Sequence, residues 1–278
     1  MSPVFPVTTI GDAPRAFQPI AIGADGEKSQ WVVPEEMPVA FVFNRRNYAV
    51  MLATPLDLID FAAGFTLTEK IVDDASEIEN LDIVYSDRGV DLRIKLSPTK
   101  LERFDVRQRR RNLPGVAGCG ACGLENADEF FEPLAPVAGE KARIATTAIG
   151  KAFAALSDHQ PLNTKTRSVH AAAWVAEDGS ILHAREDVGR HNALDKLLGA
   201  LALVDTDMNS GFVLVSSRCS YELVEKAARR GVRAMASMSG PTTFAIQKAR
   251  EANMALYARS PTGVVEVIGD DVQPDTPR

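Results

Sequence analysis

Apolar and polar residues alternate in short runs along the first hundred residues, a pattern that predicts β-strands joined by tight turns. Residues 39–43 and 48–52 are two such runs, and they flank a short stretch of Asn and Arg, so we predict a β-hairpin there. Two further strands are predicted around residues 83–85 and 90–96.

The spacing of apolar residues changes after Thr54 from that of a strand to that of a helix. Thr54 is predicted to be the N-cap of this helix, with Pro55 at its first position. Apolar side chains recur at helical spacing between residues 58 and 67, which indicates one buried face.

The second half of the chain alternates between strand and helix patterns. A hairpin is predicted around the turn residues 177–179. This alternation favours an α/β fold, in which helices cover a layered mixed sheet. Helices are predicted at 192–203, 221–230 and 242–252, and strands at 211–216, 232–237, 255–259 and 264–268.

A length of 278 residues suits one large domain or two lobes that share a core. The first 30 residues are rich in Pro, Gly and polar residues, which indicates a loose leader. We expect five segments along the chain: a flexible leader (1–30), an N-terminal sub-domain (31–105), a mobile cysteine loop (106–135), a cofactor-binding α/β core (136–270) and a flexible tail (271–278).

Composition and charge narrow the class of protein. The formal net charge of −6 argues against a general nucleic-acid binder, and three cysteines are too few for a secreted disulfide scaffold. The start of the chain has no basic, apolar signal pattern, and no run of about 18 apolar residues occurs anywhere. We therefore expect a cytoplasmic protein that makes no membrane span.

Cys119 and Cys122 are separated by two residues and bounded by glycines, which is the first indication of chemistry. Glycine allows another molecule to approach the backbone closely, and a nearby positive charge favours the thiolate form of cysteine. A zinc site needs more ligands than this pair, and a thioredoxin-type pair begins a helix. A sulfur carrier on a mobile loop fits the glycines better than either, or than two inert buried cysteines.

A run of arginines precedes the cysteine pair. It forms either a solvated loop or a local patch for an anionic partner, and both interpretations stay open. Its members are Arg103, Arg107, Arg109, Arg110 and Arg111.

Three predicted strand-to-helix turns carry small and polar residues, at 185–196, 215–222 and 237–243. Asn192 is predicted to be a helix N-cap, and the start of that helix, with Arg185 and Arg190, suits a phosphate group. A structural cluster of ion pairs explains the first turn equally well. Ligands of layered α/β folds bind outside the carboxyl ends of strands, so we expect one shared pocket.

Cys219, in the second of these turns, is expected to pack into the core rather than to react, since free cysteine is among the most buried residue types.

At these motifs the sequence resembles the FdhD family of formate dehydrogenase accessory sulfurtransferases, over most of the chain. The segments that carry the resemblance are Thr54-Pro-Leu-Asp-Leu-Ile-Asp-Phe-Ala-Ala-Gly-Phe65, Gly118-Cys-Gly-Ala-Cys-Gly123, His170-Ala-Ala-Ala, Glu186-Asp-Val-Gly-Arg-His-Asn-Ala-Leu-Asp-Lys196 and Pro241-Thr. The chain departs from the family pattern at Arg167-Ser168, where a Gly-Gly pair is usual, and at Ser260-Pro-Thr-Gly-Val-Val.

The resemblance implies a cytidine-deaminase-like fold and a homodimer. It also implies a function: the protein accepts sulfur from a cysteine desulfurase and passes it to the molybdenum cofactor that carries two guanine dinucleotides. The sulfurated cofactor then serves formate dehydrogenase. The cofactor would be a bound substrate, and no permanently bound metal is expected.

The resemblance also assigns roles to residues. Cys119 matches the persulfide-forming cysteine of the family and Cys122 its partner. The stretch Ala258, Arg259, Ser260, Pro261, Thr262, Gly263 corresponds to the family's cofactor contact region. For the rest of the pocket we expect Asp187, Arg190, His191, Asn192 and Arg218.

Deamination itself is not expected. A zinc deaminase needs His-x-Glu and Pro-Cys-x-x-Cys, but no histidine here is followed two places later by glutamate, and Gly118 stands in the place of the proline. Two alternatives to sulfur transfer stay open: a non-catalytic chaperone for cofactor and enzyme, and a small structural zinc module.

Overall fold

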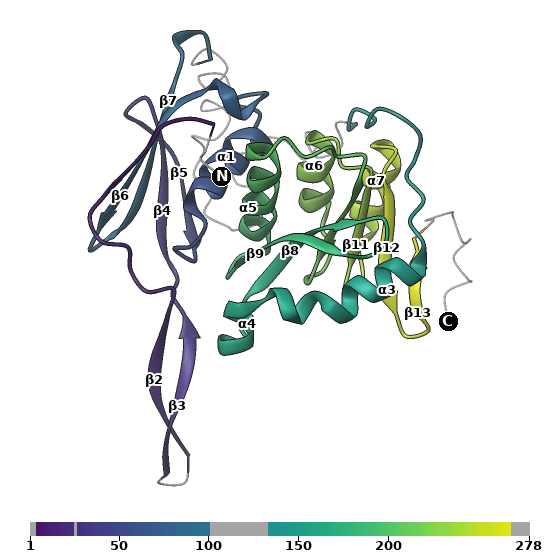
Figure 1. Ribbon diagram of the computed structural model, residues 1–278, viewed down its shortest axis with the longest axis horizontal. Helices are drawn as coiled ribbons and strands as arrows, with labels where there is room; N and C mark the ends of the chain where they lie inside the picture. The colour runs from purple at the N-terminus through teal and green to yellow at the C-terminus, as the bar shows by residue number, and fades with distance from the viewer. Residues whose placement is uncertain (1–3, 25–26, 101–132, 268–278) are drawn as a thin grey trace, which may run out of the picture.

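A five-stranded and a six-stranded sheet, which share no hydrophobic core cluster, meet along a pair of helices (Figure 1). The structure is a computed structural model, and it describes residues 4–24, 27–100 and 133–267. The N-terminal body is a five-stranded sheet covered by helix α1, and the C-terminal body is a six-stranded sheet with helices on both faces. No helix in these described ranges is long and apolar enough to cross a membrane.

The N-terminal sheet has the strand order β1-β6-β7-β4-β5. The predicted hairpin is confirmed as β4–β5, and its turn places Asn44 and Arg45 at positive φ, which suits a tight turn between twisted strands. The strands predicted after helix α1 are confirmed as the β6–β7 hairpin. The elements are β1 (Val7–Ile10), β4 (Met37–Phe43), β5 (Arg46–Ala53), α1 (Leu58–Thr68), a 3-10 turn (Ala75–Glu77), β6 (Ile78–Ser86) and β7 (Gly89–Leu96).

Aromatic packing holds α1 against this sheet. Phe65 stacks on Phe41 of β4 with ring centroids 3.8 Å apart, and Phe61 meets the same ring edge-on at 5.0 Å. All three side chains are fully buried, as the helical spacing of the sequence predicts. Such ring pairs stabilise a core beyond the area that they bury.

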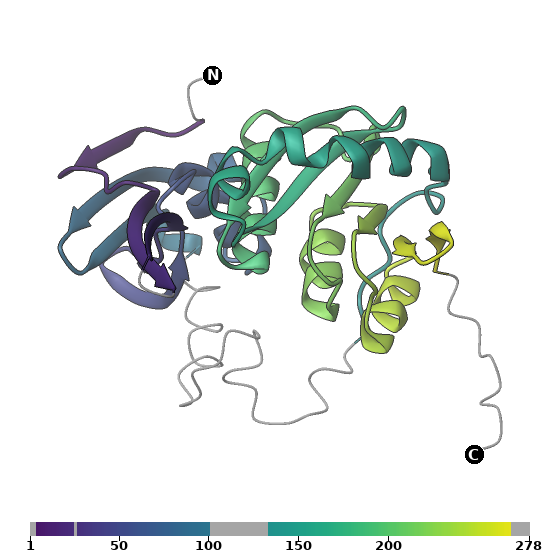
Figure 2. The same ribbon diagram turned by 90° about the horizontal axis from the view of Figure 1, so that it is seen from below.

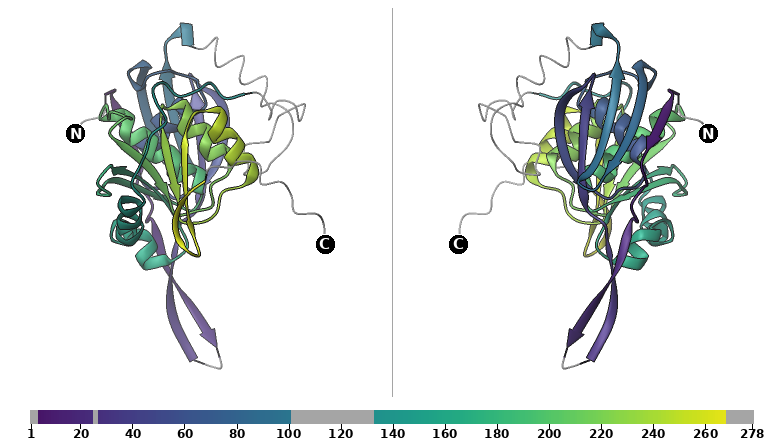
Figure 3. Two further views of the ribbon diagram at one scale, coloured as in Figure 1. Left: turned by 90° about the vertical axis from the view of Figure 1, so that its right-hand side faces the viewer. Right: turned by 90° about the vertical axis from the view of Figure 1, so that its left-hand side faces the viewer.

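The first 30 residues contain strands, although their composition indicates a loose leader. Strand β1 extends the N-terminal sheet by pairing with β6, and β2 (Phe17–Ala24) pairs with β3 (Glu27–Pro34). The β2–β3 hairpin projects away from both bodies as an arm (Figures 1 and 3). Backbone pairing with a partner far along the chain makes β1 a strand, and a composition argument does not detect it.

The C-terminal sheet has the order β13-β12-β11-β10-β8-β9, and its strand and helix predictions are confirmed. Strands β9, β10, β11 and β12 run in one direction, because β9 and β10 are both antiparallel to β8. The elements are β8 (His170–Ala176), β9 (Ile181–Asp187), α5 (Arg190–Leu203), β10 (Gly211–Val215), α6 (Tyr221–Arg229), β11 (Ala234–Ser237), α7 (Thr243–Glu251), β12 (Ala255–Ser260) and β13 (Gly263–Glu266).

Helices cover both faces of this sheet, which confirms the layered α/β class. One core lies between the sheet and α5, α6 and α7, and another lies between the opposite face and α3 (Thr146–Ala155). Figure 2 shows α3 on one side of the sheet and α6 and α7 on the other. Three further elements were not predicted from the sequence: helix α3, the 3-10 turn Leu156–His159 and the short helix α4 (Pro161–Thr166).

The two bodies meet where α1 crosses α5 with no side chain between the backbones. A Cβ atom on Gly64 would lie 1.7 Å from the carbonyl oxygen of Asp195, and one on Gly199 would lie 1.9 Å from that of Asp60. Only glycine tolerates such distances, since real Cβ atoms do not approach a backbone this closely. The contact brings the start of α5 close to the segment between β5 and α1.

Candidate functional site

The turns that follow β9, β10, β11 and β12 all lie at one edge of the C-terminal sheet, because these four strands are parallel to one another. Contacts confirm that neighbouring turns touch. His191 Nε2 lies 2.6 Å from Glu222 Oε2, and Thr242 N donates to the carbonyl oxygen of Cys219 at 3.1 Å. The structure therefore brings the three predicted strand-to-helix turns together, as a shared pocket requires.

Helix α5 begins at this edge without a side-chain cap. The prediction from sequence that Asn192 is the cap is wrong: Gly189 is the N-cap residue, and Asn192 lies inside the first turn. The amide of Asn192 points inward instead, where its Nδ2 donates to Leu52 O at 2.8 Å and to Asp187 Oδ1 at 2.9 Å. Among the described residues, no N-cap side chain occupies the first backbone N–H groups of α5, and these donors and the positive end of the helix dipole lie at the edge.

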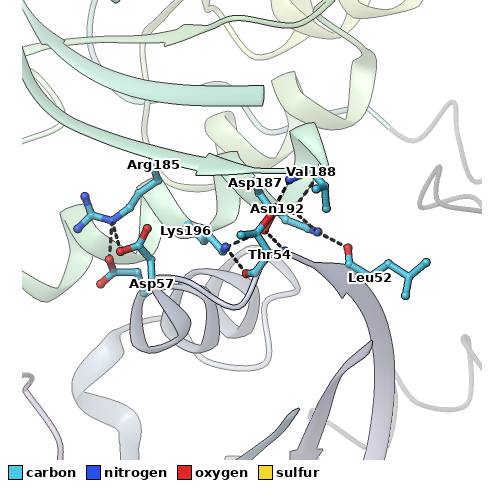
Figure 4. A network of polar contacts seen from close by, with 10 residues as sticks. Leu52, Thr54, Asp57, Arg185, Asp187, Val188, Asn192 and Lys196 are labelled. Carbon is cyan, nitrogen blue, oxygen red and sulfur yellow. Dashed lines mark hydrogen bonds and ion pairs between the residues drawn. The ribbon is translucent and has the colours of Figure 1, made fainter. Parts of the chain in front are cut away.

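Asp187 lies beneath the turn, fully buried, rather than on the surface of a pocket. Its Oδ1 accepts from Gly189 N at 2.8 Å as well as from Asn192. Its Oδ2 accepts from Lys196 Nζ at 2.7 Å and from Thr54 N at 3.0 Å (Figure 4). With both oxygens so occupied, the carboxylate supports the turn and has no role as a direct ligand contact.

Arg185 and Glu186 also face away from the turn. The Nε of Arg185 lies 2.6 Å from Asp60 Oδ2 and 3.7 Å from Asp57 Oδ1, so this arginine ties β9 to α1 and does not strengthen a phosphate site. Glu186 accepts from the first backbone N–H groups of α4, at Leu162 and Asn163, both at 2.8 Å. The ion-pair interpretation of the motif is therefore the better one for Arg185, whereas Glu186 binds the start of α4.

Arg190 and His191 remain at the edge itself, both partly buried in the first turn of α5. The Nε of Arg190 is buried and has no hydrogen-bond partner among the described residues. His170 lies at the start of β8, near Arg190. Burial lowers the pKa of His170, and the positive charge of Arg190 lowers it further. Arg218, between β10 and α6, is exposed. The edge thus carries two arginines, Arg190 in the first turn of α5 and Arg218 before α6, while the surroundings of His170 disfavour its charged form.

Helix α6 also begins at this edge without a side-chain cap, since Ser220 is the N-cap residue but its hydroxyl makes no cap bond. The Ser220 hydroxyl lies instead 3.4 Å from His191 Nε2. Because His191 also contacts Glu222, the first turns of α5 and α6 are adjacent. Helix α7 differs, as Thr242 caps it by accepting from Ala245 N at 3.2 Å.

Cys219 is buried in the core behind the second turn, as predicted. Its sulfur lies 3.5 Å from the sulfur of Met235, and burial raises the pKa of its thiol to about 12. A thiol with this pKa is almost entirely protonated near neutral pH, so it is a poor nucleophile.

The stretch from Ala258 to Gly263 lies at the same edge, at the end of β12 and in the turn to β13. Ala258 is buried, Arg259 is exposed, and the turn residues Pro261 and Thr262 are exposed. The hydroxyl of Ser260 donates to Gly263 O at 2.9 Å and accepts from Thr262 N at 3.2 Å. The turn is therefore held by its own hydrogen bonds. Arg259 is the charged residue of this stretch, and its side chain is exposed.

Cys119, Cys122 and the arginine run lie outside the described residues, so the assignments made for them stay predictions. Within residues 4–24, 27–100 and 133–267, no group of three or more His, Cys, Asp or Glu side chains is arranged to hold a metal ion.

Two residues of the site are missed by sequence reasoning. Thr54 is predicted to cap α1, but the helix begins at Leu58 after Asp57 in a left-handed conformation, and Thr54 is instead fully buried against the α5 turn. Lys196 is fully buried as well, next to Asp187. The sequence held one signal for the ion pair of Asp187 and Lys196: a lysine among the apolar residues of a predicted helix, because a buried lysine needs a counter-charge.

Comparisons with known proteins find relatives that match most of the chain. A family model described as the FdhD/NarQ family matches residues 34–267. The sulfur carrier protein FdhD of Xanthomonas euvesicatoria pv. vesicatoria (strain 85-10) is 44% identical over 238 residues, which is 85% of this chain and 84% of the relative. The protein of the same name from Cupriavidus necator (strain H16) is 45% identical over 224 residues, 81% of this chain and 77% of the relative.

A solved structure shares the fold. It is a crystal structure, from Desulfotalea psychrophila, of a protein assigned as a formate dehydrogenase accessory protein. The TM-score is 0.67 at 24% sequence identity, and the match covers 90% of this chain and 95% of that chain.

Proposed function

Because the chain belongs to the FdhD/NarQ family, we propose that it is a sulfur carrier that serves a formate dehydrogenase. It accepts sulfur from a cysteine desulfurase and delivers it to the molybdenum cofactor that carries two guanine dinucleotides. This cofactor is its bound substrate. The proposal includes a cytoplasmic location and a homodimer, as the family resemblance implies.

One observation carries the substrate class: two adjacent helices, α5 and α6, begin without side-chain caps at the strand-end edge. Uncapped N-termini offer backbone N–H donors and a positive dipole end, which is the arrangement that binds phosphate groups. Arg190 and Arg218 add positive charge at this place, and an arginine fork suits phosphate oxygens. A dinucleotide carries a diphosphate, so the edge fits that part of the proposed substrate.

The sulfur step uses Cys119. Its thiolate attacks the outer sulfur of the desulfurase persulfide, a new S–S bond forms on Cys119, and the S–S bond of the desulfurase breaks. The desulfurase cysteine leaves as a thiolate and keeps its electron pair, so no free sulfide and no external oxidant are involved. Cys122 stands two residues away and is the partner thiol. Cys219, with its raised pKa and its burial, takes no part.

Mass spectrometry after incubation with a cysteine desulfurase and cysteine tests this step. We expect one added sulfur on the peptide that contains Cys119, and the loss of this gain and of formate dehydrogenase activation in Cys119→Ala. Cys219→Ala is the matched control, and it should load sulfur like the wild-type protein. If Cys119→Ala still loads sulfur and activates the enzyme, the protein is not a persulfide carrier through Cys119. A normal activation without any loading would instead favour the chaperone alternative.

A further inference from the structure

The start of α5 belongs to the C-terminal body, but part of what holds it comes from the N-terminal body. Thr54, in the segment between β5 and α1, is fully buried against the turn that joins β9 to α5. It reaches residues that are more than 130 positions away in the sequence. This long-range contact is not a general packing contact, because it consists of directed hydrogen bonds.

Thr54 uses three of its atoms in this contact. Its backbone N–H donates to Asp187 Oδ2 at 3.0 Å, and its hydroxyl oxygen accepts from Val188 N at 3.2 Å. Its carbonyl oxygen accepts from Lys196 Nζ at 2.9 Å (Figure 4). One threonine thereby contacts the last residue of β9, the turn itself and the second turn of α5.

The buried charges at the centre of this network fix its geometry. Asp187 and Lys196 are both fully buried and lie 2.7 Å apart, and a buried ion pair is tolerated only when its remaining donors and acceptors are satisfied. Thr54 supplies one donor to the carboxylate and one acceptor to the ammonium group. A displaced Thr54 would leave both charges short of a partner.

The network ends at the backbone that begins α5. Asp187 Oδ1 holds Gly189 N, and a Cβ at Gly189 would lie 2.8 Å from Asn192 Nδ2, so the turn closes tightly on the amide. Arg190 and His191 follow directly. The direction in which the uncapped N–H groups point therefore depends on where Asp187 and Val188 are held.

We propose that Thr54 is a positioning residue for the anion site at the start of α5: through Asp187 and Val188 it sets the orientation in which α5 presents its N–H groups, Arg190 and His191 to a diphosphate. The inference rests on the proposed function for the ligand class. It assigns to the N-terminal body a role in ligand binding without any contact to the ligand.

Two substitutions at Thr54 separate positioning from packing. Thr54→Val keeps the shape of the side chain but removes the acceptor of Val188 N, whereas Thr54→Ser keeps that acceptor. Thr66→Val is the matched control, since Thr66 lies in α1, is as buried as Thr54, and among the described residues its hydroxyl bonds to Ala62 O of its own helix. If Thr54→Val weakens ligand binding only because it destabilises the fold, Thr66→Val should weaken binding as well.

The first measurement is calorimetric titration of the full-length protein with guanosine diphosphate. We expect Thr54→Val to weaken binding on the order of tenfold, which corresponds to about 1.4 kcal/mol. Thr54→Ser should bind with most of the wild-type affinity. Thr66→Val should bind like the wild-type protein, even if its melting temperature falls as much as that of Thr54→Val. Wild-type affinity in Thr54→Val, or an equal loss in Thr66→Val, would overturn the assignment.

The second measurement does not depend on the ligand. Amide hydrogen exchange of residues 188–193 should be faster in Thr54→Val and unchanged in Thr54→Ser and Thr66→Val. If the wild-type protein binds no guanosine diphosphate, the proposed function loses its anion site, but the exchange result still decides whether Thr54 holds the turn. Unchanged exchange in Thr54→Val would refute the positioning role.

Discussion

His170, at the start of β8, is a titratable residue of the strand-end edge whose pKa is shifted by its surroundings. Burial lowers its pKa below the usual 6.5, and the charge of Arg190 acts in the same direction. The folded protein therefore favours neutral His170, while the unfolded chain protonates it near its ordinary value. The stability that this group contributes is present above pH 6.5 and is lost as the pH falls through its folded pKa.

We expect the His170→Gln variant to lose less stability than the wild-type protein when the pH is lowered from about 7.5 to about 5, because glutamine cannot take up the proton. Urea unfolding at a series of pH values measures the free energy of unfolding of both proteins. Parallel curves over this range would show that His170 is not held in its neutral form.

Thr54 and Asn192 show where residue-level prediction fails. Each has the residue type and the position of a helix N-cap, and neither caps a helix. Both bond instead across the boundary between the two bodies, to partners more than 130 residues away. A capping rule uses only neighbours in sequence, so it cannot detect a competing partner that the tertiary fold supplies. Cys219 was predictable because burial of a lone cysteine is a general preference.

At the level of elements, the crossing of α1 and α5 depends on Gly64 and Gly199. A methyl group at Gly64 would lie 1.7 Å from the Asp195 carbonyl oxygen, which is backbone and cannot rotate away. The two helices would have to separate, and this would disturb the packing of both cores.

We expect Gly64→Ala to lower the free energy of unfolding by about 3 kcal/mol or more, as for other cases of overpacking. Gly150→Ala is the control, because Gly150 lies in α3 and a Cβ there would lie 4.0 Å from the nearest atom, a methyl group of Val264. That variant should be more stable by about 0.5–1 kcal/mol, since alanine favours helix. Denaturant midpoints measure both effects. Equal changes in the free energy of unfolding of the two variants would contradict the close contact of α1 with α5 at Gly64.

The elements themselves were predictable where the pattern is local. The β4–β5 and β8–β9 hairpins and helices α5 to α7 follow from alternation, turn residues and helical spacing. Strand β1 was not predictable, because it is a strand only through its pairing with β6 more than 70 residues later. The parallel order of β9 to β12 explains why separate polar turns form one edge, and this was expected from the fold class.

At the scale of the whole molecule, the β2–β3 arm stands apart from both cores. Apolar side chains on it are exposed, with Ile20 at 41% and Trp31 at 49%. Near its base, Lys165 Nζ of α4 lies over the Phe17 ring at 4.4 Å. An isolated two-stranded hairpin adds little stability of its own.

We therefore expect the protein to keep its fold when residues 18–33 are replaced by two glycines. The melting temperature should change by less than about 4 °C, which corresponds to about 1 kcal/mol for a chain of this size. Circular dichroism and differential scanning calorimetry measure this directly. A larger decrease would show that the arm supports one of the cores.

Helix α1 is shared by the two bodies, and this has a consequence for how the protein unfolds. Its aromatic face completes the N-terminal core, its glycine face touches α5, and Thr68 near its end donates to the buried Asp195 at 2.8 Å. Loss of the N-terminal sheet would expose Phe61 and Phe65, and loss of α5 would leave the opposite face of α1 without its partner. We therefore expect the free energies of the two bodies to be linked through α1, and the protein to unfold in a single cooperative transition.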